Sequence, residues 1–108
     1  MRGKDLKPSK VLVRLDRERE LRFDLNALVE LEAKFGSLNA LFGQEMTMGR
    51  LRTLLWAGLL HEDETLTERQ VGAMMDLSRL QEYAEAVAKA ITNALPAPDP
   101  NAGTPQET

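Results

Sequence analysis

The sequence predicts an α+β domain that is mostly α, in which one N-terminal β-hairpin precedes four to five short helices. Three observations predict this class: alternating apolar residues near the N-terminus, helix caps followed by apolar stripes at helical spacing, and a proline-rich end. We therefore expect a flexible N-terminus at 1–9, a single domain at 10–95, and a disordered tail at 96–108.

The hairpin is predicted from two alternating segments. In residues 10–15, Val11, Val13 and Leu15 share one face, and in residues 20–23 Leu21 and Phe23 do so. The charged residues 16–19 read as a solvated connection. A lone hairpin is only marginally stable, so it must lie on the helices or take strands from another chain. We therefore predict a homo-oligomer, formed by strand addition through Val11, Val13 and Leu15 or by contact between a basic and an acidic part of the chain.

The first helix is predicted to begin at Asp24 or Asn26, which are both capping residues. Gly36 ends it, because glycine favours the left-handed conformation found after helices. Ser37 is expected to cap a one- or two-turn helix that ends at Gly43. Thr47 is expected to cap a third helix at 48–62, which is apolar nearly all round.

Two capping boxes predict the last helices. The first spans 67–70, and the second spans 78–81 and opens the clearest helix of the chain, which ends at Pro96. The apolar stripes of these helices define the expected core: Leu28, Leu31, Phe35, Leu51, Leu54, Leu55, Leu80, Val87 and Ile91.

Composition limits the classes of function. The chain has 108 residues, one histidine and no cysteine, which excludes disulfides and thiolate zinc sites and is typical of an intracellular protein. No apolar run has transmembrane length, and no signal peptide opens the chain. We expect no membrane partner.

The net charge of −3 is unevenly distributed. Residues 1–24 have eight Lys/Arg against five Asp/Glu, giving +3, and residues 25–108 have six against twelve, giving −6. This asymmetry favours a protein partner or head-to-tail self-association over nucleic acid. The alternative is that basic residues on a strand edge simply prevent aggregation.

Known catalytic and metal-binding patterns are missing from the sequence. The segment 61–64 begins with His61, but a zinc protease needs a second histidine at position 65, where Thr65 stands. No Gly-rich phosphate loop and no Gly-x-Ser-x-Gly motif occurs. We expect a non-enzymatic protein without metal or cofactor, in which residues 61–64 form a solvated helix end.

Two further residue sets have a functional and a structural interpretation. Trp56 and Leu60 lie opposite the main stripe of their helix, so they are either covered by neighbouring elements or bind a partner. The methionines near them are adaptable binding residues or ordinary core filler. The candidate partner-binding set is Trp56, Leu60, Met46, Met48, Met74 and Met75.

The order of these elements resembles one known family. The chain resembles the tail assembly chaperones of long-tailed bacteriophages and prophages in its opening hairpin and in the segments 23–28, 32–36, 51–63, 67–72 and 84–90. The resemblance implies a non-enzymatic protein of the host bacterial cytoplasm, absent from the mature virion. It also implies two partners, the tape-measure protein and the tail-tube protein, and a longer frameshifted form in many members.

Two other functions remain open from the sequence. A structural head–tail connector or adaptor is also small and helical. A helical DNA-binding regulator is the other, but a recognition helix needs a basic face. Arg50 and Arg52 lie on an otherwise apolar helix, and the helix at 68–75 offers only Arg69 and Gln70. We therefore expect no nucleic-acid partner.

Overall fold

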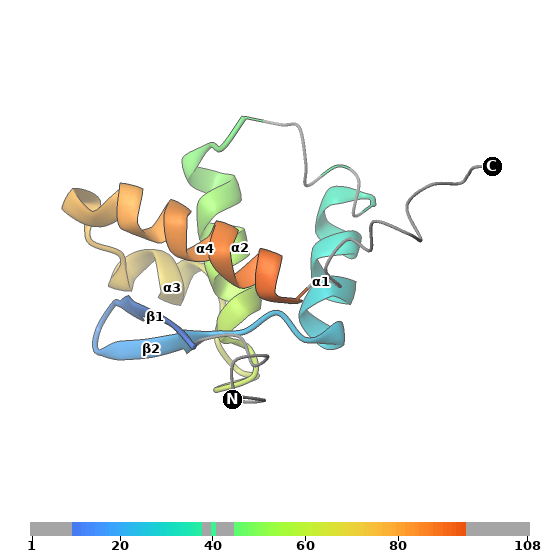
Figure 1. The fold of residues 1–108 in the computed structure, drawn as a ribbon, viewed down its shortest axis with the longest axis horizontal. Coiled ribbons are helices and arrows are strands. Elements are labelled where there is room, and N and C mark those ends of the chain that lie inside the picture. Colours follow the sequence, from blue (N-terminus) through green and yellow to red (C-terminus); the bar gives the residue numbers. More distant parts are fainter. Residues whose placement is uncertain (1–9, 38–39, 41–44, 95–108) are drawn as a thin grey trace, which may run out of the picture.

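The computed structural model describes residues 10–37, 40 and 45–94 (Figure 1). A hairpin precedes four helices and a short 3-10 helix, as the sequence predicts. The elements are β1 Val11–Arg14, β2 Glu18–Leu21, α1 Leu25–Phe35, α2 Met48–Leu59, α3 Glu68–Met74, η3 Leu77–Arg79 and α4 Leu80–Ala94. The predicted N-terminus at 1–9, the tail at 96–108 and most of the predicted helix at 37–42 lie outside the described residues. No described helix is long and apolar enough to cross a membrane.

The two strands are antiparallel, with Val11 opposite Leu21 and Arg14 opposite Glu18. Their connection is therefore residues 15–17, shorter than predicted, because Glu18 and Arg19 are part of the ladder. The inward side chains Val11 and Val13 are buried in the core, and Leu15 packs against it. The hairpin thus lies on its own helices, and these three side chains face the interior of the same chain.

Helix α2 is the centre of the fold. It contacts α1, α3, α4 and β2, and Figure 1 shows α4 crossing in front of it. This enclosure explains why α2 is apolar nearly all round. Five of the nine predicted core residues are buried, and the other four, Leu28, Phe35, Leu80 and Ile91, pack against the core while partly exposed. The five are Leu31, Leu51, Leu54, Leu55 and Val87.

Most helix ends follow their predicted caps. Asp24 accepts a hydrogen bond from the Ala27 amide, and Gly36 has a φ of 90°. Thr47 caps α2, and the Thr67 capping box opens α3.

The predicted capping box at 78–81 is wrong. Asp76, two residues earlier, accepts hydrogen bonds from the Ser78 amide (2.9 Å) and from the Ser78 hydroxyl (2.7 Å). The Ser78 side chain is thereby turned back toward Asp76 instead of capping the helix. The chain first makes the 3-10 helix η3, and α4 begins at Leu80.

Helix α2 and the end of β2 approach each other closely at Gly58. The Arg22 amide donates to the Gly58 carbonyl (2.9 Å). A Cβ atom at Gly58 would lie 2.9 Å from Leu21 Cδ2 and 3.2 Å from Phe23 Cζ. Both neighbours are buried, so they have little room to move.

We expect Gly58→Ala to lower the free energy of unfolding by about 0.5–2 kcal/mol. The overpacking costs about 1–3 kcal/mol, and the better helix propensity of alanine returns up to about 1 kcal/mol. Gly49→Ala in the same helix is the control, since no atom lies within 4 Å of its Cβ position. Urea denaturation should show opposite signs for the two variants. A stabilising Gly58→Ala would contradict the close packing.

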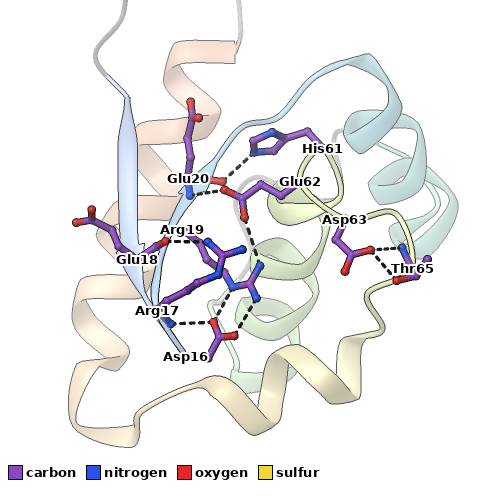
Figure 2. A network of polar contacts seen from close by, with 9 residues as sticks. All are labelled: Asp16, Arg17, Glu18, Arg19, Glu20, His61, Glu62, Asp63 and Thr65. Atoms are coloured by element: carbon purple, nitrogen blue, oxygen red, sulfur yellow. Dashed lines mark hydrogen bonds and ion pairs between the residues drawn. The ribbon is translucent and has the colours of Figure 1, made fainter.

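A polar network joins the hairpin to the end of α2 (Figure 2). Arg19, expected to be solvated, is 8% exposed. Its guanidinium donates to both carboxylate oxygens of Asp16, at 2.7 and 2.9 Å, and to Glu62 Oε1 at 3.3 Å. The expectation fails because the partner Glu62 lies far away in sequence, where no local pattern reveals it.

This network predicts an acid sensitivity. The hydrogen bonds from Arg19 lower the pKa of Asp16 from 3.8 to about 2. A carboxyl group whose pKa is lower in the folded state stabilises the fold at any pH above its unfolded-state pKa. This contribution is lost as the pH falls through the folded-state pKa. The stability difference between wild type and Asp16→Asn should therefore shrink from pH about 4 to pH about 2. Urea denaturation across this range measures it, and a constant difference would contradict the assignment.

Candidate partner-binding groove

An apolar groove of about 300 Å³ opens where the start of α2 meets α3 and the segment before α4. Helix α2 forms one wall of the groove with Met48, Gly49 and Arg52. The other wall is formed by Gly72, Met75, Leu77 and Leu80. Met48 is 66% exposed and Leu77 is 75% exposed. Exposed large apolar side chains that share a groove are typical of an interaction site.

The groove follows from the local structure of its two walls. Thr47 caps α2 by accepting from the Arg50 amide, so Met48 is the first helical residue. Met75 ends α3 with an extended backbone, at φ −74° and ψ 139°. The chain then turns through η3, which brings Leu77 to the same side as Met75. Two apolar rims thus flank a shallow floor.

The floor is held by an ion-pair network. Arg52 Nη2 lies 3.6 Å from Glu68 Oε1, and Lys34 Nζ lies 3.2 Å from Glu68 Oε2. The Arg52 side chain lies over Gly72, where a Cβ atom would be 2.9 Å from Arg52 Cδ. Gly72 therefore lets the aliphatic part of Arg52 fill the floor, while its charge is bound by Glu68.

The structure brings together only part of the predicted partner-binding set. Met48 and Met75 line the groove. Met46 is 46% exposed and lies two residues before Met48 in the chain. Met74 does not line the groove, and like Met75 it packs against the core while partly exposed.

Trp56 lies outside the groove. It is partly buried and packs against the core. Its Nε1 donates to the Leu66 carbonyl at 2.8 Å, and the Lys34 ammonium sits 5.2 Å from its ring centroid. These contacts hold the ring against its own chain, which corresponds to the structural interpretation of this residue.

Leu60 lies at the other end of α2. It lines a separate hollow of about 490 Å³ together with Arg22, Asp24, Asn26, His61 and Glu64. These neighbours are polar, so an apolar partner would find little to contact there. Among the described residues, no group of three or more His, Asp or Glu lies close enough to hold a metal ion.

Leu77 is the most exposed large apolar residue among the groove residues that are missing from the predicted partner-binding set. It stands between Asp76 and Ser78, immediately before the predicted helix, and it belongs to no apolar stripe. An apolar residue outside every stripe, beside two capping residues, is itself a sign of an exposed position. An exposed Leu77 indicates a partner-binding site only once the structure shows that Met48 lines the same groove.

One comparison with known proteins gave a match. A family model described as "Phage tail tube protein, GTA-gp10" matches residues 9–96. No curated protein and no solved structure matches the chain.

Proposed function

The chain belongs to the family described as phage tail tube protein, GTA-gp10, and is therefore a phage tail-related protein; within this group we propose that it is a tail assembly chaperone, the kind of protein that its sequence resembles. In this proposal the protein is non-enzymatic and acts in the host bacterial cytoplasm. It covers apolar helical surface of the tape-measure protein, helps to recruit tail-tube subunits, and leaves before the virion is complete.

The groove is the observation that supports a chaperone. A helical client offers apolar residues at helical spacing, and an apolar groove between helices is a common receptor for them. Met48 and Met75 suit this task, since the flexible, polarizable methionine side chain adapts to irregular partners. The rims Met48 and Leu77 are exposed, so a client can reach them without unfolding the domain.

The family description favours a second function, a structural subunit of the tail tube. A permanent subunit typically buries about 2,000–5,000 Å² in obligate interfaces that are as apolar as a protein core. A head–tail connector or adaptor would have the same requirement.

The surface of this protein fits a transient partner better than a permanent one. Among the described residues, six large apolar side chains are exposed, and only Met48 and Leu77 of them share a hollow. The others are Leu12, Leu25, Val29 and Met46. An apolar patch this small favours modest affinity and release, which is what a chaperone requires.

A groove variant tests the proposal. We expect the double variant Met48→Glu, Leu77→Glu to lose at least about tenfold in affinity for a purified tape-measure segment, because two charges would be buried against an apolar client. The double variant Leu25→Glu, Val29→Glu is the matched control, with both residues exposed on α1. Isothermal titration calorimetry with the tape-measure segment should show weakened binding for the groove variant and unchanged binding for the control variant. Equal affinities would exclude the groove as the client site.

A second measurement distinguishes a chaperone from a tube subunit or connector. Mass spectrometry of purified tails should find no stoichiometric copy of this polypeptide, while the lysate contains it. A stoichiometric copy in finished tails would support the structural functions instead.

A further inference from the structure

The outer edge of strand β2 is sealed by the end of α2. The Glu20 amide donates to Glu62 Oε2 at 3.0 Å, and the Glu20 carbonyl lies 2.8 Å from His61 Nε2. Figure 2 shows both side chains reaching β2 from the same side. Two residues further, just past the end of β2, the Arg22 amide donates to the Gly58 carbonyl. No additional strand can pair with β2 while these bonds are in place.

The same bonds define the free edge of the hairpin. In an antiparallel pair, a residue whose amide and carbonyl both point outward faces a residue that does the same. Glu20 is such a residue, and its ladder partner is Leu12. The amide and carbonyl of Leu12 therefore point out from β1, and within the described residues they make no hydrogen bond to another group. Two positions on, the Arg14 carbonyl already accepts from the Tyr83 hydroxyl at 2.9 Å.

The exposed face of β1 is basic. Lys10, Leu12 and Arg14 alternate with the buried Val11 and Val13, so their side chains share the solvent face. Leu12 is 50% exposed. Neither Lys10 nor Arg14 makes an ion pair within the described part of the chain, whereas the nearby Arg22 pairs with Glu20 at 3.7 Å.

We propose that the outer edge of β1 is a strand-addition site for an extended acidic segment of a partner protein. The Leu12 amide and carbonyl would supply the main-chain hydrogen bonds. Acidic residues opposite Lys10 and Arg14, with an apolar residue between them opposite Leu12, would match the exposed face. On the other side of β1, strand β2 already provides one such acidic partner, since Glu18 faces Arg14.

A second copy of β1 matches this edge less well. A two-fold pairing centred on Leu12 sets Lys10 opposite Arg14, and like charges that face each other across strands are destabilising. The free edge is thus better suited to an acidic partner than to the self-association predicted from the sequence.

Peptides provide the test. The probe is the peptide Thr-Glu-Thr-Val-Thr-Glu-Thr with blocked ends, and the control is the same peptide with lysine in place of both glutamates. We expect the acidic peptide to bind the full chain about tenfold more tightly than the basic one. Amide exchange by NMR should show new protection of the Leu12 amide, while the Glu20 amide, already bonded to Glu62, stays unchanged.

Two variants make the result decisive. Lys10→Glu with Arg14→Glu changes only exposed side chains, and it should reverse the preference toward the basic peptide. The groove variant Met48→Glu, Leu77→Glu should leave peptide binding intact, since it lies elsewhere on the fold. Equal binding of both peptides, or no protection of Leu12, would overturn the proposal. Protection of Leu12 that appears with protein concentration alone would assign the edge to a second copy.

Discussion

Replacing Leu55 with alanine is expected to lower the free energy of unfolding by about 2–5 kcal/mol. Leu55 is 0% exposed and lies in α2, the helix that contacts α1, α3, α4 and β2. A cavity there cannot be closed by moving one neighbour, because several elements pack on the same helix. Domains of this size are typically stable by about 5–15 kcal/mol, so this one change removes a large share.

Equilibrium urea denaturation, followed by circular dichroism and by the fluorescence of the single tryptophan, measures the effect. Leu25→Ala is the matched control, because Leu25 is also a helical leucine but is 74% exposed. We expect that control to stay within about 0.5 kcal/mol of wild type. A Leu55→Ala cost below about 1 kcal/mol would show that α2 is not the rigid centre of the core.

Local patterns predicted the elements of the fold well. The caps at Asp24, Thr47 and Thr67 each act within one helical turn, so a short window of sequence contains all the required information. The alternation in residues 10–23 likewise identifies both strands and their buried face. The start of α4 was missed for a local reason, since Asp76 and Ser78 are both good caps and the earlier one engages the later one.

Long-range contacts were beyond the reach of these patterns. Arg19 stands in a run of charged residues, and nothing near it in sequence indicates burial. Its partner Glu62 is 43 residues away, and the pairing exists only because β2 lies against the end of α2. For the same reason, the sequence predicts a solvated helix end at residues 61–64, whereas His61 bonds to the Glu20 carbonyl and Glu62 accepts from the Glu20 amide.

The candidate groove, too, was predictable from the sequence only where local information was enough. Methionine composition alone pointed to Met48 and Met75, which come from different helices and meet in the groove. The helical wheel placed Trp56 opposite the main stripe correctly, but it cannot show that the Leu66 carbonyl lies within reach of the indole. Which apolar residues bind a partner is decided by what the rest of the chain leaves uncovered.

Tyr83 is expected to be at least as sensitive to substitution as Leu55. It is 1% exposed, and its hydroxyl connects three parts of the fold. It accepts from the Asp76 amide at 2.9 Å and donates to the Arg14 carbonyl at 2.9 Å. One side chain on α4 thereby fixes both the hairpin and the segment that enters η3.

We expect Tyr83→Ala to cost about 3–5 kcal/mol of stability, because it removes a buried ring and both hydrogen bonds. Tyr83→Phe separates the two contributions. It keeps the ring and leaves an amide and a carbonyl without their partner, at a cost of about 1–3 kcal/mol. Chemical denaturation of both variants gives the two values.

Amide exchange locates the hydroxyl contribution. In Tyr83→Phe the Asp76 amide should exchange faster, since its bond to Tyr83 is the only one that it makes within the described chain. The Ala27 amide, capped by Asp24 on α1, is an internal reference that should not change. If Asp76 exchange is unaltered, then the hydroxyl does not hold the entry to η3. The position of Leu77 beside the groove would in that case depend on the bonds between Asp76 and Ser78 and on the packing of Met75 and Leu80.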